Sequence, residues 1–292
     1  MNIKSDEFLW VEKYRPQTVE DAILPKHLEK TFLDFVNQGE IPNLLLCGTA
    51  GVGKTTVAKA LCQQMGYDWI ILNGSSEGDI DTLRTKIVNF ASTVSFSGKG
   101  KVVIYDEADY LTAVTQPALR NFIEEFSKNC RFIFTCNYKN KIIPALHSRC
   151  SVIEFNIPKQ ERPAIAMRFN KRVQDILAQE NVSYDEGTVA GLLMKFFPDY
   201  RRTLNELQKL SIGGNIDAES ASNSGDVEIK AVIQFCKDKD FQKMRKWVAE
   251  TVNTSDAADI FRKVYDTMTE TLQPQSVPAC VLKIADYQYK HV

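Results

Sequence analysis

Residues 43–56 of the chain read Asn-Leu-Leu-Leu-Cys-Gly-Thr-Ala-Gly-Val-Gly-Lys-Thr-Thr. The apolar start, Asn43 to Cys47, is typical of a short strand that is buried on both faces. The spacing G-x-x-x-x-G-K-[ST] then runs from Gly48 to Thr55, and helical residues follow. Glycines in such a loop let successive backbone N–H groups face phosphate oxygens, and the following helix adds the positive end of its dipole. The stretch therefore predicts a site for a nucleoside triphosphate between a strand and a helix.

The predicted phosphate contacts extend from the loop into the first helical turn. Lys54 supplies positive charge, and the hydroxyl of Thr55 is a candidate ligand for Mg²⁺. A chance glycine-rich turn is the alternative, but the strand before the loop and the helix after it argue against that interpretation. The residues predicted to hold the nucleotide here are Gly51, Val52, Gly53, Lys54, Thr55 and Thr56.

Two further strand ends carry polar side chains. The apolar run Lys101 to Tyr105 ends in Asp106 and Glu107. We assign Asp106 to the metal ion and Glu107 to the attacking water, as its general base. The run Phe132 to Cys136 ends at Asn137, whose amide can position that water. A solvated turn is the alternative for the carboxylate pair, and a turn or helix cap is the alternative for Asn137.

The surrounding sequence alternates short apolar runs with helical patterns as far as residue 155. This alternation predicts an α/β fold in which helices flank a parallel five-stranded sheet. After Ile157 and Pro158 the strand signals stop, and the pattern is helical as far as Leu210. The expected strands are Asn43 to Cys47, Trp69 to Leu72, Val102 to Tyr105, Arg131 to Cys136 and Val152 to Phe155.

Four segments are expected along the 292 residues. We predict a P-loop ATPase domain over 1–157, a small helical lid domain over 158–212 and an all-helical collar domain over 226–292. Residues 213–225 are rich in glycine, serine and asparagine and carry no apolar periodicity, so a linker is expected there. The last segment is smaller than a typical free-standing domain and is expected to need partner helices.

Composition excludes several classes of protein. Lysine and arginine total 36 against 37 aspartate and glutamate, a net charge of −1, which argues against a uniformly basic nucleic-acid binder. No apolar run approaches the roughly 18 residues of a membrane span, and residues 1–7 lack a secretory signal, so a cytoplasmic location is predicted. The seven cysteines and three histidines lack metal-ligand spacing, and buried apolar cysteines are expected instead.

Six motifs follow one another along the chain. They are Trp10-Val11-Glu12-Lys13-Tyr14-Arg15-Pro16, the phosphate loop, Asp106-Glu107-Ala108-Asp109, Gln116-Pro117-Ala118-Leu119-Arg120, Asn137 and Ser148-Arg149-Cys150. With these motifs in this order, residues 8–211 resemble the sliding-clamp loader ATPases of the AAA+ superfamily. Three shorter stretches resemble the large subunit of T-even-type bacteriophage loaders more than cellular ones: Ile23-Leu24-Pro25, Gly66-Tyr67-Asp68 and Phe197-Pro198-Asp199-Tyr200-Arg201-Arg202.

The resemblance implies roles for residues at both ends of the nucleotide. The adenine end of ATP would be wrapped by Val11, Glu12, Lys13, Tyr14 and Ile23. From the residues alone, the same stretch could be an arm packed on the domain. By resemblance, Arg149 is the arginine finger that reaches the ATP of a neighbouring subunit. Arg201 is by resemblance the second sensor, the residue that contacts the γ-phosphate from the lid domain, and Arg202 is the alternative residue for that role. A lone exposed arginine is otherwise an ordinary solvated charge.

Position in the family also implies DNA contacts, at Arg84, Lys86, Arg120 and Lys141. In the helix around Arg120, an apolar stripe from Leu119 to Phe126 is expected to be buried. Gln116, Arg120 and Glu124 lie off that stripe, and a surface pair between Arg120 and Glu124 is the alternative to a DNA role. Only contacts to the phosphate backbone are expected, because no basic-aromatic pattern for base stacking is present. Residues 76–79 are acidic where the family pattern suggests a basic contact.

The resemblance implies an ATPase subunit that loads the sliding clamp of a DNA polymerase onto primer–template DNA during viral DNA replication, with hydrolysis releasing the clamp. ATP and Mg²⁺ are the expected ligands. The expected partners are the clamp, DNA, further copies of the chain and a different small subunit in a pentamer. The alternatives are another DNA-associated AAA+ ATPase, such as a helicase loader or branch-migration motor, and a non-catalytic structural subunit. Residues 226–292 are shorter than the collar of related loaders, so an incomplete collar is expected.

Overall fold

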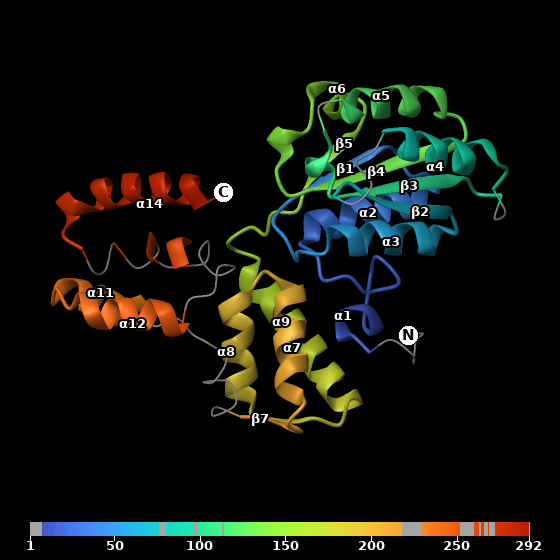
Figure 1. Ribbon diagram of the computed structural model, residues 1–292. Helices are drawn as coiled ribbons and strands as arrows, with labels where there is room; N and C mark the ends of the chain where they lie inside the picture. The colour runs from blue at the N-terminus through green and yellow to red at the C-terminus, as the bar shows by residue number, and fades with distance from the viewer. Residues whose placement is uncertain are drawn as a thin grey trace. The chain divides into compact units, whose positions relative to one another are not determined.

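The structure, a computed structural model, describes residues 8–75, 80–95, 98–112, 114–217, 229–251, 260–262, 264–265, 268 and 272–291 (Figure 1). The chain divides into two compact units, residues 1–217 and residues 218–292. The first unit contains the sheet and every residue predicted to bind nucleotide or DNA, whereas the described part of the second unit is helical. The candidate site therefore lies within the first unit.

A five-stranded sheet lies at the centre of the first unit. All neighbouring strands run parallel, and the register places Cys47 beside Cys136 and Asn73 beside Asp106. Because parallel strands end at one common edge, the residues that follow β1, β3 and β4 meet there. The predicted parallel five-stranded α/β fold is confirmed. In spatial order the strands are β2 (Asp68–Asn73), β3 (Lys101–Asp106), β4 (Cys130–Cys136), β1 (Leu44–Cys47) and β5 (Ser151–Glu154).

Helices cover both faces of this sheet because the strands are apolar on both sides. On one face, α4 (Ile80–Ser92) and α5 (Thr115–Glu125) pack against alternate strand residues such as Val103. On the other face, α2 (Lys26–Gln38) and α3 (Lys54–Met65) pack against the intervening residues, such as Val102. Figure 1 shows these two pairs of helices on opposite sides of the strands. The two apolar layers hold the carboxyl ends of the strands together.

Three longer helices follow the sheet within the same unit: α7 (Arg162–Gln179), α8 (Glu186–Phe196) and α9 (Tyr200–Ser211). The carboxylates of Asp185 and Asp199 accept backbone N–H groups at the starts of α8 and α9, so these residues are N-caps. Two short strands, β6 (Ser183–Tyr184) and β7 (Asn215–Ile216), pair in parallel. The sequence predicts no strands after residue 158, because pairs this short leave no periodic pattern.

Short elements surround the edge where the strands end. The segment η1 (Ala108–Tyr110) follows β3, whereas η2 (Lys139–Lys141) and α6 (Pro144–His147) follow β4.

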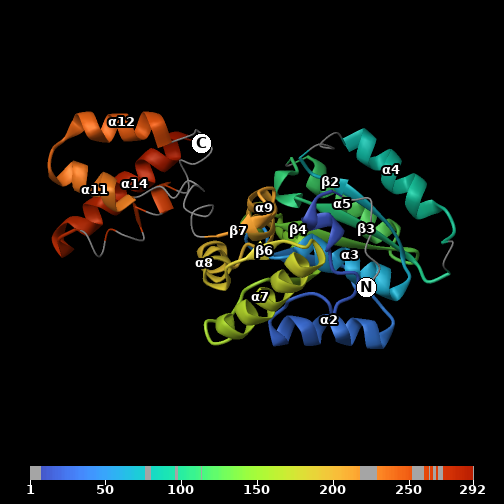
Figure 2. The same cartoon turned by 90° about the horizontal axis from the view of Figure 1, so that it is seen from below.

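The N-terminal α1 (Trp10–Lys13) contacts α9, since the backbone N–H of Trp10 donates to Oε1 of Gln208 at 3.0 Å. Helix α7 lies beside α2 (Figure 2), where Arg168 pairs with Glu29 at 3.1 Å. Helix α7 thus packs onto the sheet domain, and the N-terminal arm, residues 8–25, packs against α9.

In the second unit, residues 229–237 form α11 (Ile229–Lys237), residues 241–251 form α12 (Phe241–Thr251), and η4 (Pro274–Ser276) precedes α14 (Val277–His291). Helices are the expected structure for this part of the chain. Of the expected linker, residues 215–216 form β7, and residues 218–225 lie outside the described residues. The boundaries of the expected domains stay predictions.

All seven cysteines are free thiols. Four of them are buried, as expected, but Cys236 is exposed, with its Sγ 3.5 Å from Sδ of Met244 on α12. Within the described ranges, no group of histidine, cysteine and carboxylate side chains could hold a metal ion by itself. None of the described helices is long and apolar enough to cross a membrane.

Candidate active site

The phosphate loop joins β1 to α3. Gly51 and Gly53 adopt positive φ angles of 74° and 93°, which glycine tolerates more readily than other residues. Gly51 also meets helix α9, because a Cβ atom at this position would lie 1.8 Å from Oδ1 of Asp199. The backbone N–H of Tyr200 donates to the carbonyl of Gly51 at 3.1 Å. The loop therefore contacts the first turn of α9 as well as the sheet.

Lys54 begins α3, and its side chain folds back over the loop. Its ammonium donates to the carbonyls of Gly48 at 2.7 Å and Thr49 at 2.8 Å, and to Oδ1 of Asn137 at 2.9 Å. These three acceptors are neutral dipoles, which leaves the charge of the lysine available to an anion. Burial lowers the pKa of Lys54, although the nearby carboxylate of Asp106 opposes that effect. Lys54 is thus a buried cation where phosphate oxygens are expected.

The carboxylate of Asp106 accepts hydrogen bonds from two hydroxyl groups. Oγ1 of Thr55 donates to its Oδ1 at 2.7 Å, and Oγ1 of Thr135, on β4, donates to the same oxygen. Carboxylate and hydroxyl oxygens are ligands that Mg²⁺ accepts readily in nucleotide sites. The donor set of Thr55 and Asp106 therefore fits a magnesium ion.

Glu107 follows β3 in an unusual backbone conformation. Its φ angle is +56°, in the left-handed region that non-glycine residues seldom occupy. The conformation is held from two sides: the N–H of Glu107 donates to Oγ1 of Thr135 at 3.2 Å, and Gly74 packs against the Glu107 carbonyl, which a Cβ at position 74 would approach to 2.4 Å. Backbone strain of this kind clusters at functional sites. Here the unusual conformation lies directly after β3, at the edge of the sheet where the phosphate loop also lies.

Asp109 belongs to the motif Asp106-Glu107-Ala108-Asp109, and the sequence indicates no role for it on its own. Its side chain is 6% exposed, and its Oδ2 accepts the backbone N–H groups of Asn137 at 3.2 Å and Tyr138 at 3.3 Å. Asp109 thereby holds the turn that presents the Asn137 amide to Lys54. The spacing Asp-Glu-Ala-Asp is the only signal of this role, because the two partners lie 28 and 29 residues further along the chain.

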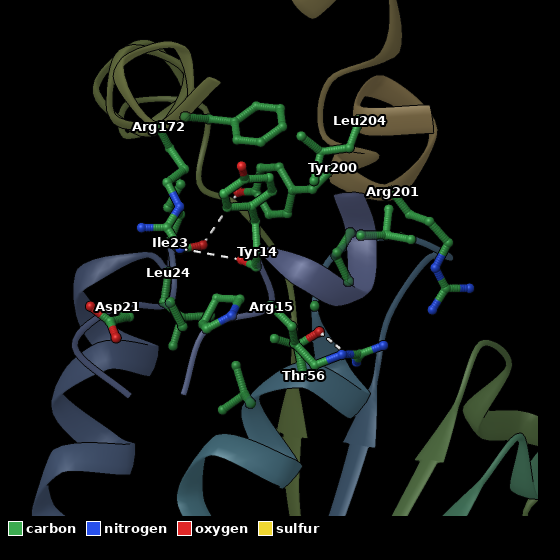
Figure 3. A pocket seen from close by; sticks show the side chains of 18 of the residues that line it. Tyr14, Arg15, Asp21, Ile23, Leu24, Thr56, Arg172, Tyr200, Arg201 and Leu204 are labelled. Carbon is green, nitrogen blue, oxygen red and sulfur yellow. Dashed lines mark hydrogen bonds between the residues drawn. The ribbon is translucent and has the colours of Figure 1, made fainter. Parts of the chain in front are cut away.

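A cavity lies between the N-terminal arm, the phosphate loop and α9 (Figure 3). Glu12 and Lys13 do not line it, because Glu12 pairs with Arg15 and Lys13 pairs with Glu180. Helical spacing explains the difference, since Val11 and Tyr14, three residues apart, lie on one side of α1. Of the predicted nucleotide contacts, those that line the cavity are Val11, Tyr14, Ile23, Gly51, Val52, Gly53, Lys54, Thr55, Thr56 and Arg201.

Residues from α7 and α9 complete the lining. Phe169 and Ile176 are buried apolar residues of α7, and nothing in the sequence shows that they border a nucleotide cavity. Arg172 extends from the same helix, and its Nη2 donates to the carbonyl of Tyr14 at 3.2 Å (Figure 3). The lining residues that sequence reasoning does not assign to the site include Phe169, Arg172, Ile176, Tyr200 and Leu204.

The two arginines at the start of α9 have different surroundings. Arg201 lines the cavity (Figure 3), whereas the guanidinium of Arg202 lies 4.9 Å from the ring centre of Phe196. Tyr200 ties the same turn to the arm through a hydrogen bond of 3.4 Å from its hydroxyl to the carbonyl of Ile23. Of the pair, Arg201 is thus the arginine that borders the cavity.

Arg149 does not belong to this cavity. It follows α6, and its Nε donates to Oε1 of Glu124, on α5, at 2.8 Å, while Nη1 donates to the carbonyl of Ala145 at 2.9 Å. Its side chain is 30% exposed. The structure therefore places Arg149 apart from the chain's own cavity.

The cations predicted to contact DNA are exposed on three elements. Arg84 and Lys86 lie on α4, and Arg120 lies on α5, where it donates to Oδ1 of Asn121 at 3.2 Å. Lys141, in η2, has its ammonium 5.2 Å from the ring centre of Tyr138 and 5.7 Å from that of Tyr110. A basic and aromatic cluster thus forms in space from separate segments, which the sequence pattern does not reveal. Residues 76–79 lie outside the described residues.

The structure contradicts one alternative and one expectation for α5. Glu124 pairs with Arg149 in place of Arg120, because the end of α6 packs against this helix. Gln116, expected off the buried stripe, is only 3% exposed. Its amide donates to the carbonyl of Lys141 at 3.0 Å and accepts the N–H of Ile143 at 2.8 Å. Gln116 therefore joins α5 to the segment between η2 and α6.

Comparison with known proteins agrees with this geometry. The model of the family described as "ATPase family associated with various cellular activities (AAA)" matches residues 44–158. The sliding-clamp-loader large subunit of Escherichia phage RB69 is 39% identical over 251 residues, 84% of this chain and 78% of that protein. The corresponding subunit of Enterobacteria phage T4 is 35% identical over 283 residues, 95% of this chain and 88% of that protein.

The chain belongs to the clamp-loader family of AAA ATPases. Membership of this ATPase family makes the chain a nucleotide-binding enzyme. A cellular member, replication factor C subunit 5 of Homo sapiens, is 34% identical over 296 residues, 96% of this chain and 85% of that protein. A solved structure of a RuvB mutant from Thermotoga maritima matches with a TM-score of 0.61 at 14% identity, over 91% of each chain. At that identity the RuvB match supports the fold alone.

Proposed function

We propose that this clamp-loader ATPase uses ATP to load the sliding clamp of a DNA polymerase onto primer–template DNA during viral replication. The observation that carries the proposal is the meeting of three strand ends, where Lys54 Nζ lies 2.9 Å from Asn137 Oδ1 and Thr55 Oγ1 lies 2.7 Å from Asp106 Oδ1. The relatives named as loader subunits in two phages supply the biological context.

Each group at this edge has a role in hydrolysis. Lys54 exchanges its neutral acceptors for phosphate oxygens, and Asn137 positions the attacking water. Glu107 orients that water and accepts its proton. Thr55 and Asp106 would hold Mg²⁺, which neutralises charge on the phosphates when bound. Gly51, Val52, Gly53 and Thr56 surround the phosphates with backbone and side-chain donors.

The base end of ATP lies in the part of the cavity formed by the arm and α7. Val11, Tyr14 and Ile23 supply its apolar walls. Glu12 and Lys13 support the arm from outside the cavity, through Arg15 and Glu180. Arg201 approaches the γ-phosphate from α9, so the angle of that helix reports whether ATP is bound.

Arg149 completes the ATP site of a neighbouring subunit. Its guanidinium stabilises negative charge on the transferring phosphoryl group, which makes hydrolysis depend on assembly. Since one chain carries both a cis site and a trans finger, several copies can act in succession. We propose a pentamer of these copies with a different small subunit, in the cytoplasm of the host.

DNA is gripped by its backbone. Arg84, Lys86, Arg120 and Lys141 are the proposed phosphate contacts, and they carry no base specificity. ATP binding organises the assembly around the open clamp, DNA then aligns Glu107 with the neighbour's Arg149, and hydrolysis releases the clamp.

Steady-state ATPase assays of the assembled complex test this function. Clamp and primer–template DNA together should raise the rate, and Glu107→Gln should abolish the increase while ATP still binds. If no clamp or DNA raises the rate, the loader function is wrong. If Glu107→Gln keeps the stimulated rate, the catalytic assignment alone is wrong.

A further inference from the structure

A carboxylate from another helix holds the guanidinium of Arg149. Nε and Nη2 of Arg149 both donate to Oε1 of Glu124, the Nε bond at 2.8 Å. Glu124 lies in the last turn of α5, and Arg149 lies beyond the end of α6, 25 residues later. The carboxylate is 56% exposed and the arginine 30% exposed, so the pair lies at the surface and is accessible to another subunit.

The remaining donors of the guanidinium are divided between the chain and the outside. A guanidinium carries five N–H groups in a rigid plane. Nη1 donates to the carbonyl of Ala145 at 2.9 Å and, at 3.4 Å, to the hydroxyl of Ser148. Nη2 carries two N–H groups, and Glu124 is the acceptor for one of them. Glu124, Ala145 and Ser148 thus accept four of the five N–H groups, which leaves the second N–H of Nη2 for a partner outside these contacts.

The carboxylate of Glu124 keeps its charge at neutral pH. The hydrogen bond from Arg149 and the positive charge of its guanidinium hold the pKa of Glu124 below its usual range, and Arg120 adds a smaller effect in the same direction. Two cations therefore act on one carboxylate. Arg120 lies one helical turn before Glu124 on α5, so it acts on the carboxylate from the same helix, whereas Arg149 approaches from beyond α6.

Helix α5 is itself tied to the segment before α6. Gln116, one turn before Arg120, accepts the N–H of Ile143 and donates to the carbonyl of Lys141. The first and last turns of α5 thus both contact the segment that leads to Arg149. The segment from Lys141 to Arg149 is therefore joined to α5 at two points, Gln116 and Glu124.

We propose that Glu124 is a positioning residue for the trans-acting Arg149. It holds the guanidinium plane so that one edge faces a neighbouring subunit, and it links the orientation of that plane to α5, the helix that carries Arg120. The proposal rests on the proposed role of Arg149 as an arginine finger. The competing interpretation is an ordinary surface ion pair, which would contribute little to any property of the protein.

Charge-changing variants at position 124 test the proposal in the assembled complex of the full chain with its partner subunits, clamp and DNA. Glu124→Gln should lower kcat for ATP about two- to fivefold, the range that the loss of one exposed charge pair allows. Glu124→Lys should lower kcat about tenfold, because like charges repel the guanidinium. KM for ATP should stay unchanged, since the finger acts on the transition state. Glu125→Gln, the adjacent exposed glutamate of α5, is the matched control and should keep the parent kcat.

A double-mutant cycle separates positioning from general damage. In an Arg149→Ala background, Glu124→Gln should cause no further loss of kcat, because the group that it positions is gone. The proposal is wrong if the Glu124 variants keep the parent kcat or raise it, or if the full loss persists without Arg149. If the thermal unfolding midpoints of the Glu124 variants equal that of Glu125→Gln, the fold is intact. If Glu124→Gln has a lowered midpoint that accounts for its loss of kcat, the proposal is also wrong. If Arg149→Ala keeps full activity, the failure lies in the proposed finger itself.

Discussion

Gly51 combines a positive φ of 74° with close packing against Asp199, whose Oδ1 would lie 1.8 Å from an added Cβ. Asp199 is not free to move aside, because the same oxygen accepts the N–H of Arg202 at the start of α9. Gly53, in the same loop, has a φ of 93° but faces open space. Gly53 is therefore needed only for its backbone angle, whereas Gly51 is needed both for its backbone angle and for the close approach of the loop to α9.

Alanine substitutions at these glycines should have unequal effects on stability. Gly53→Ala should lower the free energy of unfolding by about 1–2 kcal/mol, the cost of the left-handed conformation. Gly51→Ala should lower it by about 1–3 kcal/mol more, because the new methyl group also displaces the cap of α9. Denaturant titration of the nucleotide-free chain measures both values. Equal losses would show that α9 does not press on the loop.

Nucleotide affinity should depend on pH through Lys54. Burial holds the pKa of Lys54 below its ordinary value of 10.5, whereas bound phosphate favours the charged ammonium. As pH rises through the lowered pKa, ATP must bind together with a proton, so affinity should fall before pH 10.5 is reached. Titration with a fluorescent ATP analogue between about pH 8 and pH 10 measures this. Lys54→Arg stays charged throughout and should give a flatter curve; two parallel curves would contradict the assignment.

At the scale of elements, helix α1 forms a bridge between the cavity and the later helices. One face of α1 lines the cavity through Val11 and Tyr14. Oε1 of Glu180, after α7, accepts from the Lys13 ammonium and from the Tyr14 hydroxyl, each at 2.6 Å. Burial and this hydrogen bond raise the pKa of Tyr14 well above its usual value, so its hydroxyl remains a donor. The arm is therefore expected to move with α7 when nucleotide binds.

Removing the charge of Glu180 should loosen this bridge. Glu180→Gln should weaken ATP binding about fivefold, equivalent to about 1 kcal/mol, because two hydrogen bonds to a carboxylate become bonds to a neutral amide. The rate constant kcat should change little, since no reacting group is touched. Equilibrium titration with a fluorescent ATP analogue gives the affinity. Glu186→Gln, on the exposed side of α8, is the control, and equal affinities for the two variants would contradict the bridge.

For the whole molecule, a net charge of −1 gives no general attraction to DNA. The proposed DNA contacts are a few exposed cations on α4, α5 and η2 of the first unit. Each phosphate contact releases counterions, and contacts from several copies on one duplex add together. Several copies of a nearly neutral subunit can therefore bind DNA together, with an affinity that depends strongly on salt concentration.

Neighbouring lysines of η2 allow a matched test of this interface. The ammonium of Lys141 lies 5.7 Å and 5.2 Å from two tyrosine ring centres, whereas Lys139 pairs with Glu154. Lys141→Ala should weaken binding of primer–template DNA to the complex and reduce the slope of log affinity against log salt by about one per bound copy. Lys139→Ala should leave the slope unchanged. Fluorescence anisotropy over a range of salt concentrations measures both, and identical slopes would remove Lys141 from the interface.

Much of the active site could be predicted from sequence because its signals are local. An apolar run before a glycine-rich loop, or before Asp106 and Glu107, predicts a buried strand and its polar end. Parallel strands then bring those ends to one edge without further information. Asp109 and Arg172 were beyond such reasoning, because each contacts backbone groups of a distant segment. No pattern within their own elements indicates those partners.

The sequence by itself determined the strand–loop–helix unit, the two carboxylates and the family, since these depend on backbone preferences and spacing within short segments. Only the tertiary structure decided which charges pair. Helical spacing alone favours a pair of Arg120 and Glu124, yet Glu124 holds Arg149, and Gln116 is buried against the segment before α6. The physical reason is that periodicity indicates which face of a helix is polar, whereas the packing of elements distant in sequence decides what that face meets.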